Sequence, residues 1–137
     1  MTNMMKEIRL HHVGYVVADI RLSAAQFAQL GYVAGEILYD EGLQVELCYL
    51  TKEGAPLVEL VHQLQSGSLE ASLLHANGVM PYHLAYEALG FDKACEELLA
   101  QGYERLFAPV QVGALQGIRI CYFHHPDAGY IELIEKR

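Results

Sequence analysis

The segment HHVGYVVADIRLSAAQFAQLGY, residues 11–32, returns later in the chain as YHLAYEALGFDKACEELLAQGY, residues 82–103. With one constant offset, which brings His12 onto His83, no gap is needed and four positions are identical. Both segments also carry apolar residues at the i, i+4, i+7 and i+8 spacing of a helix face that packs on a core. These are Ile20, Ala24, Phe27 and Ala28 in the first segment, and Phe91, Cys95, Leu98 and Leu99 in the second. We interpret the chain as two copies of one unit.

A second pair of matching segments supports this interpretation. LVELV at 57–61 corresponds to YIELI at 130–134, and Glu59 then falls on Glu132 after a change of two residues in loop length. Each segment reads as a buried strand with one carboxylate at its centre. Burying a carboxylate without a partner is costly, so each Glu is expected to be paired, protonated or bound to a metal.

The pattern predicts the same order of elements in both copies: a strand, an amphipathic helix and three further strands, which is an α+β fold. A Gly suited to the C′ position closes each helix. We expect a single domain over residues 1–137, with internal modules at 7–63 and 80–135 and a connector at 64–79 that contains a short helix. The predicted elements of the first module are 7–18, 20–31, 34–40, 43–51 and 56–63, and those of the second are 80–88, 91–102, 104–110, 117–124 and 129–135.

Composition narrows the class of protein. The net charge is −8 and the nine Lys and Arg residues are scattered, which disfavours a nucleic-acid partner. No apolar run approaches the ~20 residues of a membrane helix, and the N-terminus lacks the apolar core of a signal peptide. The three Cys residues are far apart and form no CxxC pair, as expected for reduced thiols. We therefore expect a cytoplasmic protein without a membrane partner.

Each half contributes one His on its first strand and one Glu on its last strand. If the halves pack about a pseudo-twofold axis, then His12, Glu59, His83 and Glu132 converge on one divalent metal ion. A mixed nitrogen and oxygen set suits Zn, Ni, Co, Mn or Fe, and the sequence does not choose among them. A single His or Glu of this kind is more often a hydrogen-bonded core residue, so the prediction depends on the match across the repeat.

The chain resembles the vicinal oxygen chelate superfamily, which includes glyoxalase I, methylmalonyl-CoA epimerase, extradiol dioxygenases and the fosfomycin and bleomycin resistance proteins. The segments that carry the resemblance are HHVGYVVADI, PLVELVHQ, PYHLAYE and YFHHPDAGYIELIE. The resemblance implies paired βαβββ modules that form an open, cup-shaped mixed sheet around a metal, with the helices outside. It also places His12, Glu59, His83 and Glu132 at the four ligand positions.

All four positions hold residues that can bind a metal, and in this the chain resembles glyoxalase I and the epimerases. The epimerases differ in carrying Gln where this chain has Glu59. Both branches remove a proton next to a carbonyl and stabilise the enediolate on the metal. The resemblance implies two candidates for the base: Glu132, and Glu46 on a strand face with Gln44, Cys48 and Leu50 that could line the cup. The implied substrates are a glutathione hemithioacetal or a CoA thioester. Arg residues that could bind glutathione carboxylates are Arg9, Arg21 and Arg119.

Two other functions remain open. A protein of this fold could bind a small molecule without catalysis, as the resistance proteins do. An extradiol dioxygenase is less compatible, because the resemblance implies that this branch has no ligand at the position of Glu59. The family resemblance also implies a homodimer.

Overall fold

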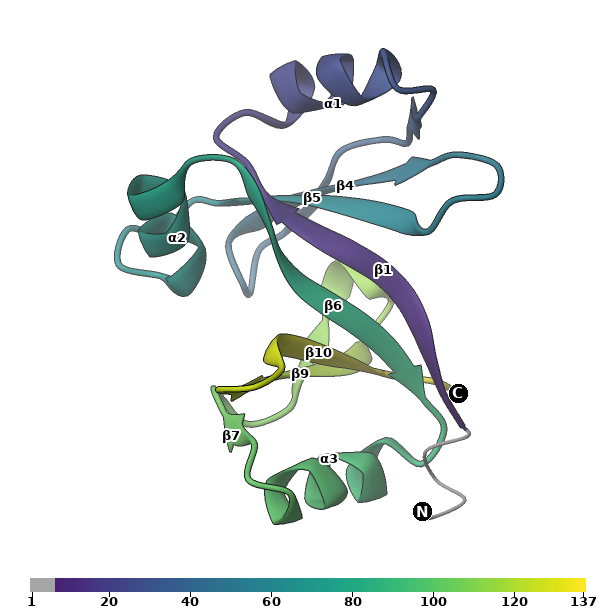
Figure 1. The fold of residues 1–137 in the computed structure, drawn as a ribbon, viewed down its shortest axis with the longest axis vertical. Helices are drawn as coiled ribbons and strands as arrows, with labels where there is room; N and C mark the ends of the chain where they lie inside the picture. Colours follow the sequence, from purple (N-terminus) through teal and green to yellow (C-terminus); the bar gives the residue numbers. More distant parts are fainter. Residues whose placement is uncertain (1–6) are drawn as a thin grey trace. The chain divides into compact units, whose positions relative to one another are not determined.

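The computed structural model describes residues 7–137. The contacts that residues make in space divide the chain into two compact units. The first unit is His12–Tyr82, and the second unit is His83–Arg137 together with the segment up to His11. Each unit has its own paired strands and its own hydrophobic core, and Figure 1 shows the elements along the chain.

The first unit is a mixed sheet with a helix on one face. Strand β1 (Ile8–Val16) pairs in parallel with β5 (Leu57–Gln63) from His12 onward, and β5 pairs antiparallel with β4 (Val45–Thr51). The short strands β2 (Val33–Ala34) and β3 (Leu38–Asp40) both pair with β4. Helix α1 (Ile20–Ala28) packs on β4 and β5, and α2 (Leu69–Asn77) contacts β5 (Figure 1).

The second unit repeats this arrangement. Strand β6 (Met80–Ala88) pairs in parallel with β10 (Gly129–Glu135) from His83 onward, and β10 pairs antiparallel with β9 (Ile118–His125). The short strands β7 (Glu104–Arg105) and β8 (Val110–Val112) both pair with β9, and a 3₁₀ turn (Gly113–Leu115) follows β8. Helix α3 (Phe91–Ala100) contacts β10. The predicted α+β class and the repeated βαβββ order are confirmed.

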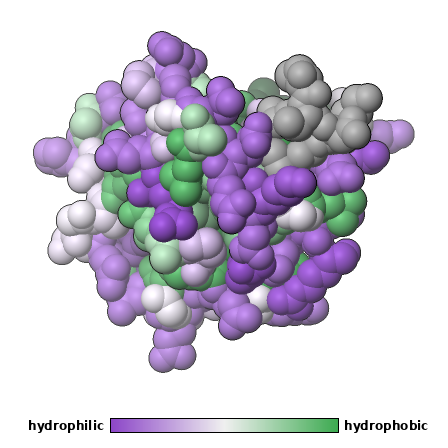
Figure 2. Space-filling model, turned by 90° about the horizontal axis from the view of Figure 1, so that it is seen from below, coloured by the Kyte–Doolittle hydropathy of each residue, from purple (hydrophilic) through white to green (hydrophobic). Residues whose placement is uncertain are grey.

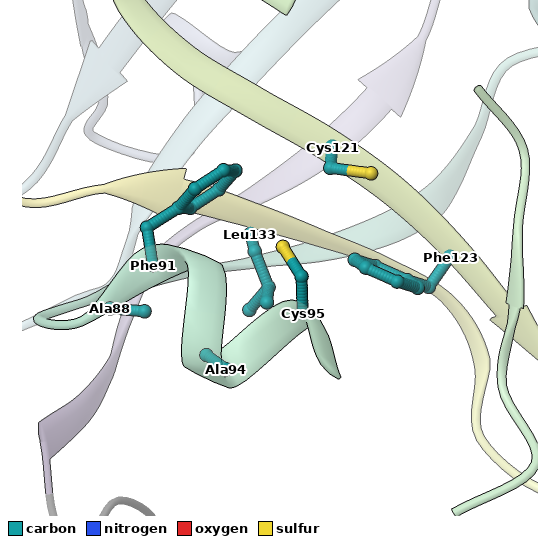
Figure 3. Packing of buried hydrophobic residues seen from close by; sticks show 7 residues of the cluster. All are labelled: Ala88, Phe91, Ala94, Cys95, Cys121, Phe123 and Leu133. Atoms are coloured by element: carbon teal, nitrogen blue, oxygen red, sulfur yellow. The ribbon is translucent and has the colours of Figure 1, made fainter. Parts of the chain in front are cut away.

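Alternation along the strands builds one core under each main helix. In the first unit, Cys48, Leu50, Val58 and Leu60 face Ile20 of α1. In the second unit, Cys121, Phe123 and Leu133 face α3. Figure 3 shows this second cluster, in which Phe91 and Cys95 of α3 point toward the strand residues. A hydrogen bond with Cys121 raises the pKa of the Cys95 thiol, and burial of the thiol is the second largest cause.

Both main helices end in the same way. Tyr32 N donates to Phe27 O and Gly31 N donates to Ala28 O, which is the paired hydrogen bonding of a Schellman motif. Tyr103 and Gly102 make the equivalent bonds to Leu98 and Leu99. Both glycines have a φ of +93°, which favours glycine. The prediction of a C′ glycine in each copy is confirmed, and the regular helices end two or three residues earlier than predicted.

A charged cluster fixes the start of α3 against the last strands of the second unit. The Arg119 guanidinium on β9 donates to both carboxylate oxygens of Asp92, at 3.0 and 3.1 Å, and to Glu135 Oε2 at 2.9 Å. It also lies over the Phe91 ring, 4.9 Å from the centroid. These hydrogen bonds raise the pKa of Arg119 and lower the pKa of Glu135.

The surface carries isolated apolar residues. Figure 2 shows one face, on which hydrophilic residues predominate and hydrophobic residues show in small areas between them. Within residues 7–137, no helix has the length and apolar character that crossing a bilayer requires.

Candidate metal centre

In the first unit the strand register brings His12 and Glu59 together. His12 of β1 lies beside Leu57 of β5, so Glu59, two residues further along, points from the same face. The two side chains meet with His12 Nε2 3.1 Å from Glu59 Oε1. His12 is 1% exposed and Glu59 4% exposed. This face of the sheet is the one opposite to α1.

The second unit contains the same pair in the same register. His83 of β6 lies beside Tyr130 of β10, and Glu132 again follows two residues further along. His83 Nε2 lies 3.1 Å from Glu132 Oε1, and the two residues are 3% and 4% exposed. The repeat detected in the sequence is therefore also a repeat of side-chain geometry.

The distance within each pair suits two ligands of one cation. Ligand atoms at roughly 2.0–2.2 Å from a zinc-like ion are about 3.0–3.5 Å apart, and each His–Glu separation is 3.1 Å. All four side chains are of the types that could hold a metal ion. The donor set and its burial are those of a metal site.

Two further residues belong to these faces and were not predicted as site residues. Tyr49 of β4 lies opposite Glu59, and Tyr122 of β9 lies opposite Glu132. The Tyr49 and His12 ring centroids are 5.8 Å apart, and those of Tyr122 and His83 are 5.2 Å apart. The sequence did contain a signal: the dipeptide Cys-Tyr occurs at 48–49 and again at 121–122, with the offset that relates Glu59 to Glu132.

Glu46 occupies a different face. It shares its side of β4 with Cys48 and Leu50, as predicted, but these two residues belong to the core that packs against α1. Glu46 lies opposite His62, and Tyr49 lies opposite Glu59. Glu46 and Tyr49 are three residues apart on β4, so their side chains point to opposite faces of the sheet. The register therefore directs Glu46 to the helix side of the sheet and not to the face that carries His12 and Glu59.

The three Arg residues considered for substrate carboxylates also differ. Arg119 is engaged by Asp92 and Glu135 and has a structural role in anchoring α3. Arg9 and Arg21 are exposed. Of the three, Arg119 is thus the least available to a ligand.

The chain matches a known protein family over most of its length. The model of the glyoxalase/bleomycin resistance protein/dioxygenase superfamily matches residues 11–122. No curated protein gives a significant match.

Solved structures resemble the whole fold. The crystal structure of methylmalonyl-CoA epimerase from Mycobacterium tuberculosis has a TM-score of 0.79 and 25% identity, over 94% of this chain and 88% of that one. A hypothetical protein from Bacillus halodurans C-125 has the same TM-score with 20% identity, over 95% of both chains. A single-residue variant of Streptomyces coelicolor methylmalonyl-CoA epimerase, in complex with 2-nitronate-propionyl-CoA, has a TM-score of 0.77 and 22% identity, over 93% of this chain and 96% of that one.

Proposed function

Because the chain belongs to the glyoxalase/bleomycin resistance protein/dioxygenase superfamily, we propose that it is a metal-dependent enzyme that removes a proton from a carbon next to a carbonyl. In this proposal one divalent ion, among Zn, Ni, Co, Mn and Fe, takes ligands from His12, Glu59, His83 and Glu132. The observation that carries the proposal is the pair of equivalent, buried His–Glu contacts, one in each unit.

A bound divalent cation would act as a Lewis acid on the substrate carbonyl and stabilise the negative charge that develops there. The chain itself must supply the base. We assign this role to Glu132, whose carboxylate is buried beside His83 and lies on the site face of its sheet. Glu46 is the weaker candidate because its strand face packs against α1.

The proposed reaction uses one carboxylate of the chain as its base. Glu132 takes the proton from the α-carbon and can return it on the same side. Inversion at that carbon requires a proton from the opposite side, and we assign its supply to solvent, because Glu59 as a metal ligand carries no proton. A 1,2-proton shift of the glyoxalase type needs only one base.

The substrate we favour is a 2-substituted acyl-CoA thioester, which makes the reaction an epimerisation. The support is the likeness to methylmalonyl-CoA epimerase over nearly the whole chain at 25% identity. A specific observation keeps a second candidate: Glu59 is a buried carboxylate, and by the family resemblance this position carries Glu in glyoxalase I and Gln in the epimerases. The second candidate substrate is therefore a hemithioacetal of methylglyoxal and glutathione.

Exchange of the α-proton with solvent tests both substrates. The metal-loaded protein is incubated in D₂O with methylmalonyl-CoA or with the hemithioacetal, and deuterium incorporation is followed by mass spectrometry. We expect exchange with one of them, loss of exchange in Glu132→Gln, and retention in Glu46→Gln. For an acyl-CoA substrate, Glu59→Gln should retain exchange, because the family resemblance gives the epimerases Gln at this position.

The control is the metal content of each variant, because a Glu132→Gln chain that has also lost its metal says nothing about the base. Exchange that survives in metal-loaded Glu132→Gln and disappears in Glu46→Gln would reverse our assignment. A metal-loaded wild-type protein that exchanges neither substrate would leave the non-catalytic binding function as the better account. Less than about half an equivalent of metal per chain after purification without chelator would favour the same conclusion.

Location and assembly are also proposals. Cys48, Cys95 and Cys121 are free buried thiols, which suits a reducing compartment, and we propose that the protein is cytoplasmic. A homodimer is the assembly that the family resemblance implies, and sedimentation analysis would test it.

A further inference from the structure

We propose that Tyr49 and Tyr122 are positioning residues that hold the metal-binding imidazoles of His12 and His83 in their ligating orientation. This inference rests on the proposed function, since it assumes that both histidines bind the metal. It assigns a role to two residues that are not metal ligands in that proposal.

The contact geometry is the first support. The Tyr49 and His12 rings meet nearly perpendicular, at an interplanar angle of 72°. Tyr122 and His83 are tilted by 53°. Edge-on and tilted arrangements are those that aromatic pairs prefer, so each phenol ring stabilises one orientation of its imidazole. That orientation is the one in which Nε2 faces the Glu carboxylate at 3.1 Å.

The strand register is the second support. Each Tyr lies directly opposite the Glu of the site, on the neighbouring antiparallel strand. Opposite residues point from the same face of a sheet, so Tyr and Glu share one face in each unit, and the His lies on that face too, opposite the residue two positions before the Glu. The phenol ring and the carboxylate therefore both contact the imidazole on this face, and together they restrict its orientation.

Repetition is the third support. Tyr49 and Tyr122 are related by the same offset as Glu59 and Glu132, and both contact the equivalent His. Tyr103 also contacts a histidine, His125, at 4.8 Å between centroids. His125 is not one of the proposed ligands, so this third pair has the same ring types without a role in the site. Tyr103 therefore provides a matched control.

The test measures metal affinity and not activity. Apoprotein is titrated with Co²⁺ in competition with a chromogenic chelator, for the wild type and for Tyr49→Phe, Tyr49→Leu, Tyr122→Phe and Tyr122→Leu. The Phe variants keep the ring and should bind within about 2-fold of the wild type. The Leu variants lose the ring and should bind about 3- to 10-fold more weakly, as expected for the loss of one aromatic pair. The visible Co²⁺ absorption bands should also change in the Leu variants, because the ligand geometry relaxes.

Two controls make the result specific. Tyr103→Leu removes a ring from a non-ligand histidine and should leave Co²⁺ affinity unchanged. Tyr49→Met and Tyr122→Met replace the ring by a long flexible side chain and serve if a Leu variant does not fold. The Met variants should show the same weakening as the Leu variants.

The outcomes separate this inference from the proposed function. A wild-type protein that binds no Co²⁺ would overturn the proposed function, and this inference with it. A wild-type protein that binds Co²⁺, with Leu and Met variants that bind as tightly as the Phe variants, would overturn only the positioning role. Equal weakening in Tyr103→Leu would also overturn it, because the effect would then be general.

Discussion

His12 and His83 occupy the same position relative to a Glu two residues further along the facing strand. If both bind one metal ion, their removal should have the same effect. We expect His12→Ala and His83→Ala each to weaken metal binding by at least about 100-fold, because even outer-shell partners of a metal are worth 10- to 100-fold. Isothermal titration calorimetry with Zn²⁺ measures this.

His62 is the control for that pair of variants. It is on the same strand as Glu59 but on the opposite face, where its Nδ1 lies 3.1 Å from Val17 O. His62→Ala should retain the metal affinity of the wild type. Retention of full affinity in both His12→Ala and His83→Ala would contradict the site, and a large loss in only one would contradict a shared ion.

The carboxylate of Glu135 makes the free energy of unfolding depend on pH in the acidic range. Hydrogen bonds from Arg119 lower its pKa in the folded protein below the ordinary value of 4.5. The charged form is thus favoured by folding, and its contribution is present above about pH 4.5 and lost as the pH falls through the lower, folded pKa. Glu135→Gln should give a stability profile that declines less steeply below pH 4.5, measured by urea unfolding.

Glu96→Gln is the matched control for this profile. Glu96 is an exposed carboxylate on α3, and its replacement should leave the acid dependence as in the wild type. If the Glu135→Gln and wild-type profiles run parallel down to pH 2.5, the ion pair with Arg119 does not contribute to stability.

At the scale of single residues, much of the candidate site could be predicted because a repeat doubles each observation. A lone His or Glu carries little information, whereas a His and a Glu that both recur at matching places indicate a common role. Glu46 has no acidic counterpart in the second copy, since the residue aligned with it at the offset of 73 is Arg119. Its face on the strand was predicted correctly from alternation, but the side on which the helix packs could not be read from the strand alone.

The glycines that end α1 and α3 are the element-scale features most sensitive to change. Gly31 and Gly102 have a φ of +93°, and an added Cβ at Gly102 would come no closer than 3.7 Å to a neighbour. Gly102→Ala should therefore cost about 1–2 kcal/mol from backbone strain alone. Gly31→Ala should cost about the same, because it has the same φ and its added Cβ would make only ordinary contacts with the Lys52 side chain, the nearest at 3.4 Å. Chemical denaturation measures both values.

Gly42→Ala is the control, because its φ is not positive and its added Cβ would make only one contact, at 3.4 Å from the Asp40 side chain. A change below about 0.5 kcal/mol is expected there. If Gly102→Ala is equally neutral, the left-handed conformation does not stabilise the end of α3.

Most elements could be predicted because period and turn residues agree. The strand at 80–88 and the strand at 129–135 have the predicted bounds. In place of the predicted strand 34–40 the structure has Val33–Ala34 and Leu38–Asp40, and in place of 104–110 it has Glu104–Arg105 and Val110–Val112, which extends beyond the predicted end. Within each unit both pieces pair with the same neighbour. The alternation of polar and apolar residues continues through such a break and does not reveal it. The position of the break depends on where the facing strand offers hydrogen-bond partners.

At the scale of the molecule, a shared ion would connect folding to metal binding. A ligand that binds only the folded chain stabilises it, by about 2.7 kcal/mol at 100 times its dissociation constant. For a chain of this size, chelation should lower the melting temperature by roughly 5–15 °C. His12→Ala should show no further decrease on chelation. Scanning calorimetry with and without EDTA measures both, and an unchanged melting temperature of the wild type would argue against a structural contribution of the metal.

The division of the chain at His11 and His12 gives the second unit an unusual construction. Its core includes Leu133 near one end of the chain and receives Ile8, which precedes the entire first unit in sequence. The ribosome therefore completes the first unit before the strands β9 and β10 emerge, while Ile8 has already been synthesised. During translation the first unit can fold as one continuous stretch. The second unit can complete its core only when its late strands pack against Ile8, which left the ribosome before the first unit did.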